Sequence, residues 1–119
     1  MNKICCTSPE QSKKLIELGI DVNTADMWYQ HIGWKHLADN SEVPVYFPMI
    51  TRDRESDEDI PAWSLNGLMD ILAKQDFRIK CVNNQFNIDI PSRHCKIWFP
   101  SLLEAAFEMV VYLLKENKI

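Results

Sequence analysis

A chain of 119 residues has room for one domain with one hydrophobic core. Its apolar content of 46% and charged content of 25% are ordinary for a folded globular protein and argue against a largely disordered chain. The net charge of −4 counts against duplex nucleic acid as the main partner, because neutralising phosphates requires a basic face.

The first helix has clear start and stop signals. Ser8 is the expected N-cap, and Gln11 completes a capping box with it. Gly19 is placed to adopt a left-handed conformation just after the helix, and Ile20 can fold back onto Leu15 as in a Schellman motif. The sequence therefore predicts one short amphipathic helix beginning at residue 9.

The segment from residue 21 to residue 61 has weaker signals. A short helical turn is expected at 23–24, and 43–50 is expected to be extended. Two prolines inside 43–50 allow only an edge strand or an irregular segment there. The charged run 52–59 lacks the glycine and the final glutamate of a calcium loop, so we expect a solvated loop.

A second helix is expected after Ser64, which is its predicted N-cap. Its apolar positions follow helical spacing: Leu65, Leu68, Met69, Ile71 and Leu72. Gly67 either weakens this helix or allows another backbone to approach it closely.

A β-hairpin is predicted over residues 77–90, with Asn83 and Asn84 in a two-residue turn. This register gives one apolar face: Phe77, Ile79, Cys81, Phe86, Ile88 and Ile90. The opposite face is polar: Arg78, Lys80, Asn87 and Asp89. A slip of one residue would mix the two faces, so the register is strongly favoured. It also predicts an ion pair between Arg78 and Asp89.

A third strand is expected from Cys95 to Phe99, with Lys96 and Trp98 facing outward. Ser101 and Glu104 then form a capping box for the last helix. That helix is apolar around most of its circumference, so a second helix or another subunit should cover it. We therefore expect one α+β domain over residues 1–119, with a three-stranded antiparallel sheet, helices packed on one face and a long apolar C-terminal helix. A homodimer or larger homo-oligomer is expected.

The sequence favours a non-enzymatic protein without a metal or cofactor. Nucleophile-elbow, P-loop, dinucleotide-binding and zinc-protease motifs are absent, and three glycines cannot build a phosphate cradle. The four cysteines, Cys5, Cys6, Cys81 and Cys95, form no CxxC pair and are expected to be buried reduced thiols. No secretion signal or membrane span is expected, so the predicted location is the cytoplasm. A small hydrolase or metal protein is the third-ranked alternative.

Two binding surfaces are candidates. The outward face of the predicted sheet would place an aromatic ring among cations, which suits a nucleotide with its base on Trp98. The ligand-binding residues of this hypothesis are Arg78, Lys80, Arg93, Lys96 and Trp98. The alternative at this face is that another part of the chain covers it.

A protein-binding surface is the second hypothesis, because Trp and Tyr dominate interface hot spots. Its candidate residues are Trp28, Tyr29, Tyr46 and Phe47. The other role for such side chains is anchoring of the core or of loops.

Three segments resemble a family of small uncharacterised proteins from phages and integrated elements of gut bacteria. They are residues 8–27 (SPEQSKKLIELGIDVNTADM), 61–72 (PAWSLNGLMDIL) and 105–114 (AAFEMVVYLL). The resemblance implies an accessory protein that acts inside an infected bacterial cell. Small phage proteins of this kind often block host defence, so it suggests sequestration of a nucleotide-type signal. Binding to a host enzyme or a phage assembly factor is the alternative.

Overall fold

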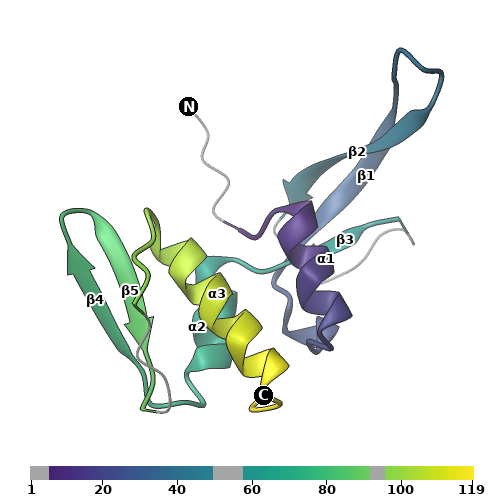
Figure 1. Ribbon diagram of the computed structural model, residues 1–119. Helices are drawn as coiled ribbons and strands as arrows, with labels where there is room; N and C mark the ends of the chain where they lie inside the picture. The colour runs from purple at the N-terminus through teal and green to yellow at the C-terminus, as the bar shows by residue number, and fades with distance from the viewer. Residues whose placement is uncertain (1–5, 50–57, 92–95) are drawn as a thin grey trace.

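The computed structural model describes residues 6–49, 58–91 and 96–119, with the backbone alone at 47–49 (Figure 1). Three α-helices, one short 3-10 helix and five strands lie in these ranges. In chain order they are α1 (Pro9–Glu17), η1 (Val22–Thr24), β1 (Met27–His36), β2 (Glu42–Met49), β3 (Ile60–Ala62), α2 (Leu65–Leu72), β4 (Arg78–Val82), β5 (Gln85–Asp89) and α3 (Leu102–Lys115).

The strands form a three-stranded antiparallel sheet in the order β2-β1-β3 and a separate hairpin, β4-β5. The predicted α+β class with a three-stranded antiparallel sheet is therefore confirmed, but other residues build that sheet. Within the predicted third strand, residues 96–98 form no strand, and Phe99 makes only an isolated bridge to Phe86. The Asn87 side chain donates a hydrogen bond to the Ile97 carbonyl (2.9 Å), which competes with main-chain pairing at this point.

The β4-β5 hairpin has the predicted register from Val82 opposite Gln85 to Arg78 opposite Asp89. Asn83 and Asn84 have φ values of 51° and 61°, the left-handed region that a two-residue turn of this type requires. The predicted Arg78–Asp89 ion pair is wrong, because Asp89 pairs with Lys80 at 2.7 Å instead.

The two faces of this hairpin differ from the prediction. Ile88 and Ile90 are buried as expected, but Ile79 and Cys81 on the outer strand β4 are exposed. Conversely, Asn87 and Asp89 of the predicted solvent face are buried. Strand β5 pairs with β4 along one edge, is bridged by residue 99 along the other and packs against α3 (Figure 1), so it is the inner strand of the hairpin and β4 is the outer one.

The predicted N-caps of α1, α2 and α3 are confirmed, but of the two predicted capping boxes only that of α1 forms, because the Glu104 side chain makes no bond back to Ser101. Ser8 and Gln11 form the reciprocal capping box of α1, with bonds of 3.1 and 2.9 Å. Gly19 has a φ of 92°, and the Ile20 N–H donates to the Leu15 carbonyl as in a Schellman motif. Ser64 and Ser101 cap α2 and α3 as expected. The neighbour at Gly67 is a carboxylate and not a backbone, because a Cβ there would lie 2.8 Å from Asp26 Oδ1.

Helix α3 is covered by its own chain. It contacts β5, α2 and α1, and its buried residues are Ala105, Ala106, Phe107, Met109, Val110, Val111, Leu113 and Leu114. Elements of the same chain thus cover the apolar surface of α3, which was the reason for expecting a homo-oligomer. Nowhere in the described ranges does a helix combine the length and apolar character needed to cross a membrane.

Trp63 lies in the helical core and is bonded to Thr7, which neighbours the core of the β2-β1-β3 sheet. Its side chain is fully buried in the helical core, and its indole N–H donates to Thr24 Oγ1 (2.9 Å). Its backbone N–H donates to Thr7 Oγ1, and its carbonyl accepts from the Thr7 N–H. A smaller second core lies against the β2-β1-β3 sheet and consists of Cys6, Tyr29, Ile60 and Ala62, with Met27 and Tyr46 partly buried beside it.

Candidate functional site

The outer part of the β1-β2 hairpin, residues 31–46, extends away from the helices as a two-stranded arm (Figure 1). Within the described residues, β3 pairs with residues 27–29 of β1, at the base of the sheet. The radius of gyration is 15.7 Å, whereas a compact domain of this length should have ~13.5 Å. The molecule is therefore more extended than a single packed core requires.

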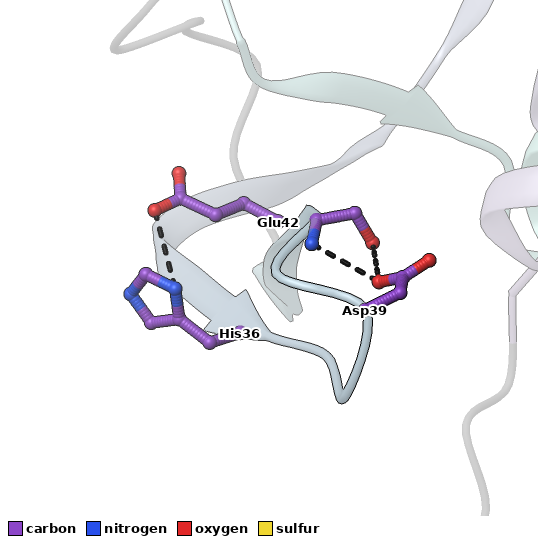
Figure 2. A network of polar contacts seen from close by, with 4 residues as sticks. His36, Asp39 and Glu42 are labelled. Carbon is purple, nitrogen blue, oxygen red and sulfur yellow. Dashed lines mark hydrogen bonds and ion pairs between the residues drawn. The ribbon is translucent and has the colours of Figure 1, made fainter.

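The tip of this arm is an ordered turn (Figure 2). The Ser41 hydroxyl and backbone N–H both donate to Asp39 Oδ1, at 2.6 and 3.0 Å. These bonds, the hydroxyl first, lower the pKa of the Asp39 carboxyl below its ordinary value. His36 Nδ1 lies 3.4 Å from Glu42 Oε1 across the strands and forms an ion pair when the imidazole is protonated. The tip is thus closed by polar contacts among its own residues.

A bulge sets which side chains share a face of the arm. The register shifts between His31, which pairs with Tyr46, and Gly33, so that Ile32 is an extra residue on β1. Residues 31 and 34 of a regular strand would point to opposite faces. Beyond the bulge, Trp34 pairs with Pro44. The bulge therefore brings His31 and Trp34 to one face, beside Tyr46.

These three side chains form an aromatic triad. The His31 ring packs edge to face against Trp34 (centroids 4.9 Å apart) and against Tyr46 (5.6 Å apart). Trp34 is 54% exposed, whereas His31 and Tyr46 are half-buried. The triad is the main aromatic surface of the arm.

Carboxylates lie next to the triad. The His31 N–H donates to Asp59 Oδ1 (2.9 Å), and Asp59 is buried although the sequence placed it in a solvated loop. Burial, followed by the negative charges of Glu58 and Asp59, raises the pKa of the Tyr46 hydroxyl above its ordinary value. A tyrosine hydroxyl is protonated at neutral pH, so Tyr46 presents a hydrogen-bond donor close to these carboxylates.

The open edge of β2 is a poor template for another strand. Pro44 and Pro48 are four residues apart, so their nitrogens point to the same side of the strand. If these nitrogens faced β1, the β1-β2 ladder would lose two hydrogen bonds. They therefore face the open edge of β2, which has no N–H donor at these two positions. Side chains, and not strand addition, are therefore the contacts that this arm offers.

A cleft of about 640 Å³ lies beside Tyr46. Residues 43–46 of β2 line one side of it, and the N-terminal ends of α1 and α3 contribute to the other. The face of the arm with Tyr46 is thus continuous with a concave surface on the body of the molecule.

The structure brings together only part of the predicted nucleotide site. Arg78 and Lys80 line one concavity of about 400 Å³, but Asp76 and Asp89 line it too. Lys96 and Trp98 are exposed and lie outside that concavity. Arg93 is outside the described residues. The two carboxylates offset the two cations, so the concavity is not strongly basic.

The predicted protein-binding residues also separate. Trp28 and Tyr29 are buried, and the Tyr29 hydroxyl donates to the Thr7 carbonyl (2.6 Å). Each presents little surface to a partner, although Trp28 lines one concavity and Tyr29 lines the cleft beside Tyr46. Tyr46 belongs to the triad, and the Phe47 side chain is outside the described part of the structure. The exposed residues that the sequence reasoning missed are Ile32, Trp34, Leu37 and Val43; Gly33 within an aromatic strand-like run was their available signal, because glycine there often marks a bulge.

Of the cysteines, Cys6 is buried as predicted, Cys81 is exposed against the prediction, and Cys5 and Cys95 lie outside the described residues. Among the described residues, no three His, Cys, Asp or Glu side chains are grouped as a metal site would need. No family model, no curated protein and no solved structure gives a significant match to this chain. The geometry of the arm therefore carries the functional argument.

Proposed function

We propose that this protein is a non-enzymatic interaction module that binds a partner protein through the arm and its aromatic triad. The observation that carries the proposal is the exposure of Trp34 on a two-stranded ribbon. Such ribbons are marginally stable in water without a covered face. A half-exposed Trp beside a Tyr is also the side-chain type that dominates binding energy at interfaces.

The imidazole of the triad favours binding over catalysis. His31 contacts two aromatic rings, and its backbone N–H, not its ring, is bonded to the Asp59 carboxylate. A general base instead needs a ring nitrogen oriented by an acid and aimed at a reacting group. The phage setting comes from the resemblance of the helical segments, and it makes a host protein our proposed partner, with inhibition of host defence as the biological outcome.

Site-specific crosslinking tests this proposal. A photoreactive benzophenone amino acid at Ile32, which is 53% exposed on the arm, should give a discrete adduct in bacterial host lysate. The matched control is the same group at Val82, which is 55% exposed on the other hairpin. The Ile32 adduct should disappear when Trp34 is changed to alanine. Equal adducts at both positions, or none at Ile32, would contradict the proposal.

Binding of a nucleotide-type signal is the second candidate function, because Arg78 and Lys80 line one concavity. A ligand at ~100 times its Kd stabilises a protein by about 2.7 kcal/mol, which means an increase in Tm on the order of ten degrees for a domain of this size. A thermal-shift screen against linear and cyclic nucleotides checks this. Replacing both lining cations, Arg78→Glu with Lys80→Glu, should remove the shift, and a flat response across the panel would eliminate this candidate.

A further inference from the structure

The hydrogen-bonding groups of the triad indicate what kind of segment it binds; this step rests on the proposed function. Trp34 Nε1–H and the Tyr46 hydroxyl make no hydrogen bond with any described residue, so both can donate to a ligand. An indole N–H can only donate. The best ligand backbone is therefore one that presents carbonyl oxygens and few N–H groups.

A polyproline II segment has that character. Its carbonyls point into solvent, its prolines have no N–H, and it is already ordered before binding. Flat aromatic side chains are its usual receptors. A β-strand ligand would instead need donors from the edge of β2, where Pro44 and Pro48 supply none. Because these prolines disfavour strand addition at the edge of β2, the side chains of the triad are the expected contact surface.

The charges beside the triad select a basic ligand. The Asp59 carboxylate accepts a hydrogen bond from the His31 N–H (2.9 Å) next to the triad, and its neighbour Glu58 is exposed. Burial and then these two negative charges raise the pKa of the Tyr46 hydroxyl. A Lys or Arg next to the prolines would complement this potential, and an acidic residue would be repelled. The same charges disfavour nucleic acid at this surface.

A second copy of this chain fits the arm less well. Trp34 pairs with Pro44, so the two side chains share a face of the arm. Val43 is next to Pro44 in the strand and therefore points to the opposite face. The exposed apolar area is thus divided between two faces, whereas a stable interface covers ~800 Å² on each partner. Two copies would also bring like charges together, since each chain has a net charge of −4.

We infer that the partner of the arm is a proline-rich segment with a flanking basic residue, which packs its prolines on Trp34 and Tyr46. The cleft beside Tyr46 gives such a segment room to continue along β2 toward the helices.

Fluorescence anisotropy with synthetic probes tests this inference on the purified protein. The probe is a labelled peptide of eight prolines preceded by Arg, and the control peptide replaces the prolines with alternating Gly and Ser. The proline peptide should bind at least about tenfold more tightly than the control. Replacing its Arg by Glu should weaken binding several-fold, and added salt should reduce that difference.

Variants assign the binding to the triad. Trp34→Ala should weaken it at least about tenfold, as for a hot-spot residue. Tyr46→Phe keeps the ring and removes the donor, and Trp34→Phe keeps an aromatic ring of smaller area and removes the donor; each should weaken binding several-fold. Trp98→Ala removes a comparably exposed Trp that lies beside the β4-β5 hairpin and not on the arm, and it should leave peptide binding unchanged. An unchanged urea-unfolding midpoint shows that each variant is folded.

Three results would overturn this inference: equal binding of the two peptides, equal loss in Trp34→Ala and Trp98→Ala, or self-association that depends on Trp34. If the Ile32 crosslink persists while the proline peptide does not bind, the proposed function stands and this inference falls. If the crosslink also fails, both fall.

Discussion

Replacing Trp63 with alanine is expected to lower the free energy of unfolding by about 3–5 kcal/mol. Its side chain is fully buried, and its indole N–H bonds to Thr24. Truncation would leave a cavity in the helical core and remove the hydrogen bond that Thr24 Oγ1 accepts from the indole N–H. Because domains have total stabilities of about 5–15 kcal/mol, this loss would be a large fraction of the whole.

Urea denaturation followed by circular dichroism measures this effect. Trp63→Phe keeps most of the ring volume and removes the N–H, so its expected cost is smaller, about 1–3 kcal/mol. Trp98→Ala is the matched control at a position that is 40% exposed, and its expected cost is within about 0.5 kcal/mol. Equal costs at positions 63 and 98 would show that Trp63 is not central to the core. If Trp63→Ala does not fold, Trp63→Phe still allows the comparison.

Features that depend on neighbouring residues were predictable from the sequence. The capping box of α1 and its Schellman stop are set within a few residues by Ser8, Gln11 and Gly19. The β4-β5 register follows from the Asn83–Asn84 turn and the alternation on either side. Each is a local pattern with a strong stereochemical cause.

The three-stranded sheet depends on contacts distant in sequence. The bulge at Ile32 reverses the alternation halfway along β1, so this strand has no continuous period of two. Strand β3 has only three residues and pairs with β1 across more than 30 positions. Neither signal identifies a strand without knowledge of its partner.

The exposure of the candidate residues could not be predicted for the same reason. Trp28 and Tyr29 look equivalent to Trp34 in sequence, but β3 and Cys6 cover the base of the sheet, whereas the arm extends beyond them. At the other hairpin, the bond from Asn87 to the Ile97 carbonyl helps cover a face that alternation alone marks as exposed. Exposure was decided by packing between distant segments and not by residue type.

Replacing Tyr29 with phenylalanine is expected to lower the free energy of unfolding by about 1–3 kcal/mol at neutral pH. The hydroxyl donates to the Thr7 carbonyl at 2.6 Å and lies 3.3 Å from Cys6 Sγ, in a buried environment. Phenylalanine fits the same space but leaves that carbonyl without this donor. The matched control is Tyr112→Phe, at a half-buried tyrosine on α3.

The difference between wild type and Tyr29→Phe should shrink as the pH rises above about 10, the ordinary pKa of tyrosine. Burial and the contact with Cys6 raise the pKa of Tyr29 in the folded state. The unfolded chain then releases this proton first, so the stabilisation is complete below pH 10 and is lost as the pH approaches the folded-state pKa. One group lowers the free energy of unfolding by at most about 1.4 kcal/mol per pH unit.

Urea denaturation of both proteins at several pH values between 7 and 11 isolates this contribution, because lysine titration affects them equally and cancels in the difference. A gap that stays constant across this range would mean that Tyr29 ionises equally in both states. The hydroxyl would then be in contact with water, and the second core would not seal the base of the arm. A gap that narrows would show that the Tyr29 hydroxyl is shielded from water in the folded state, so the second core seals the base of the arm.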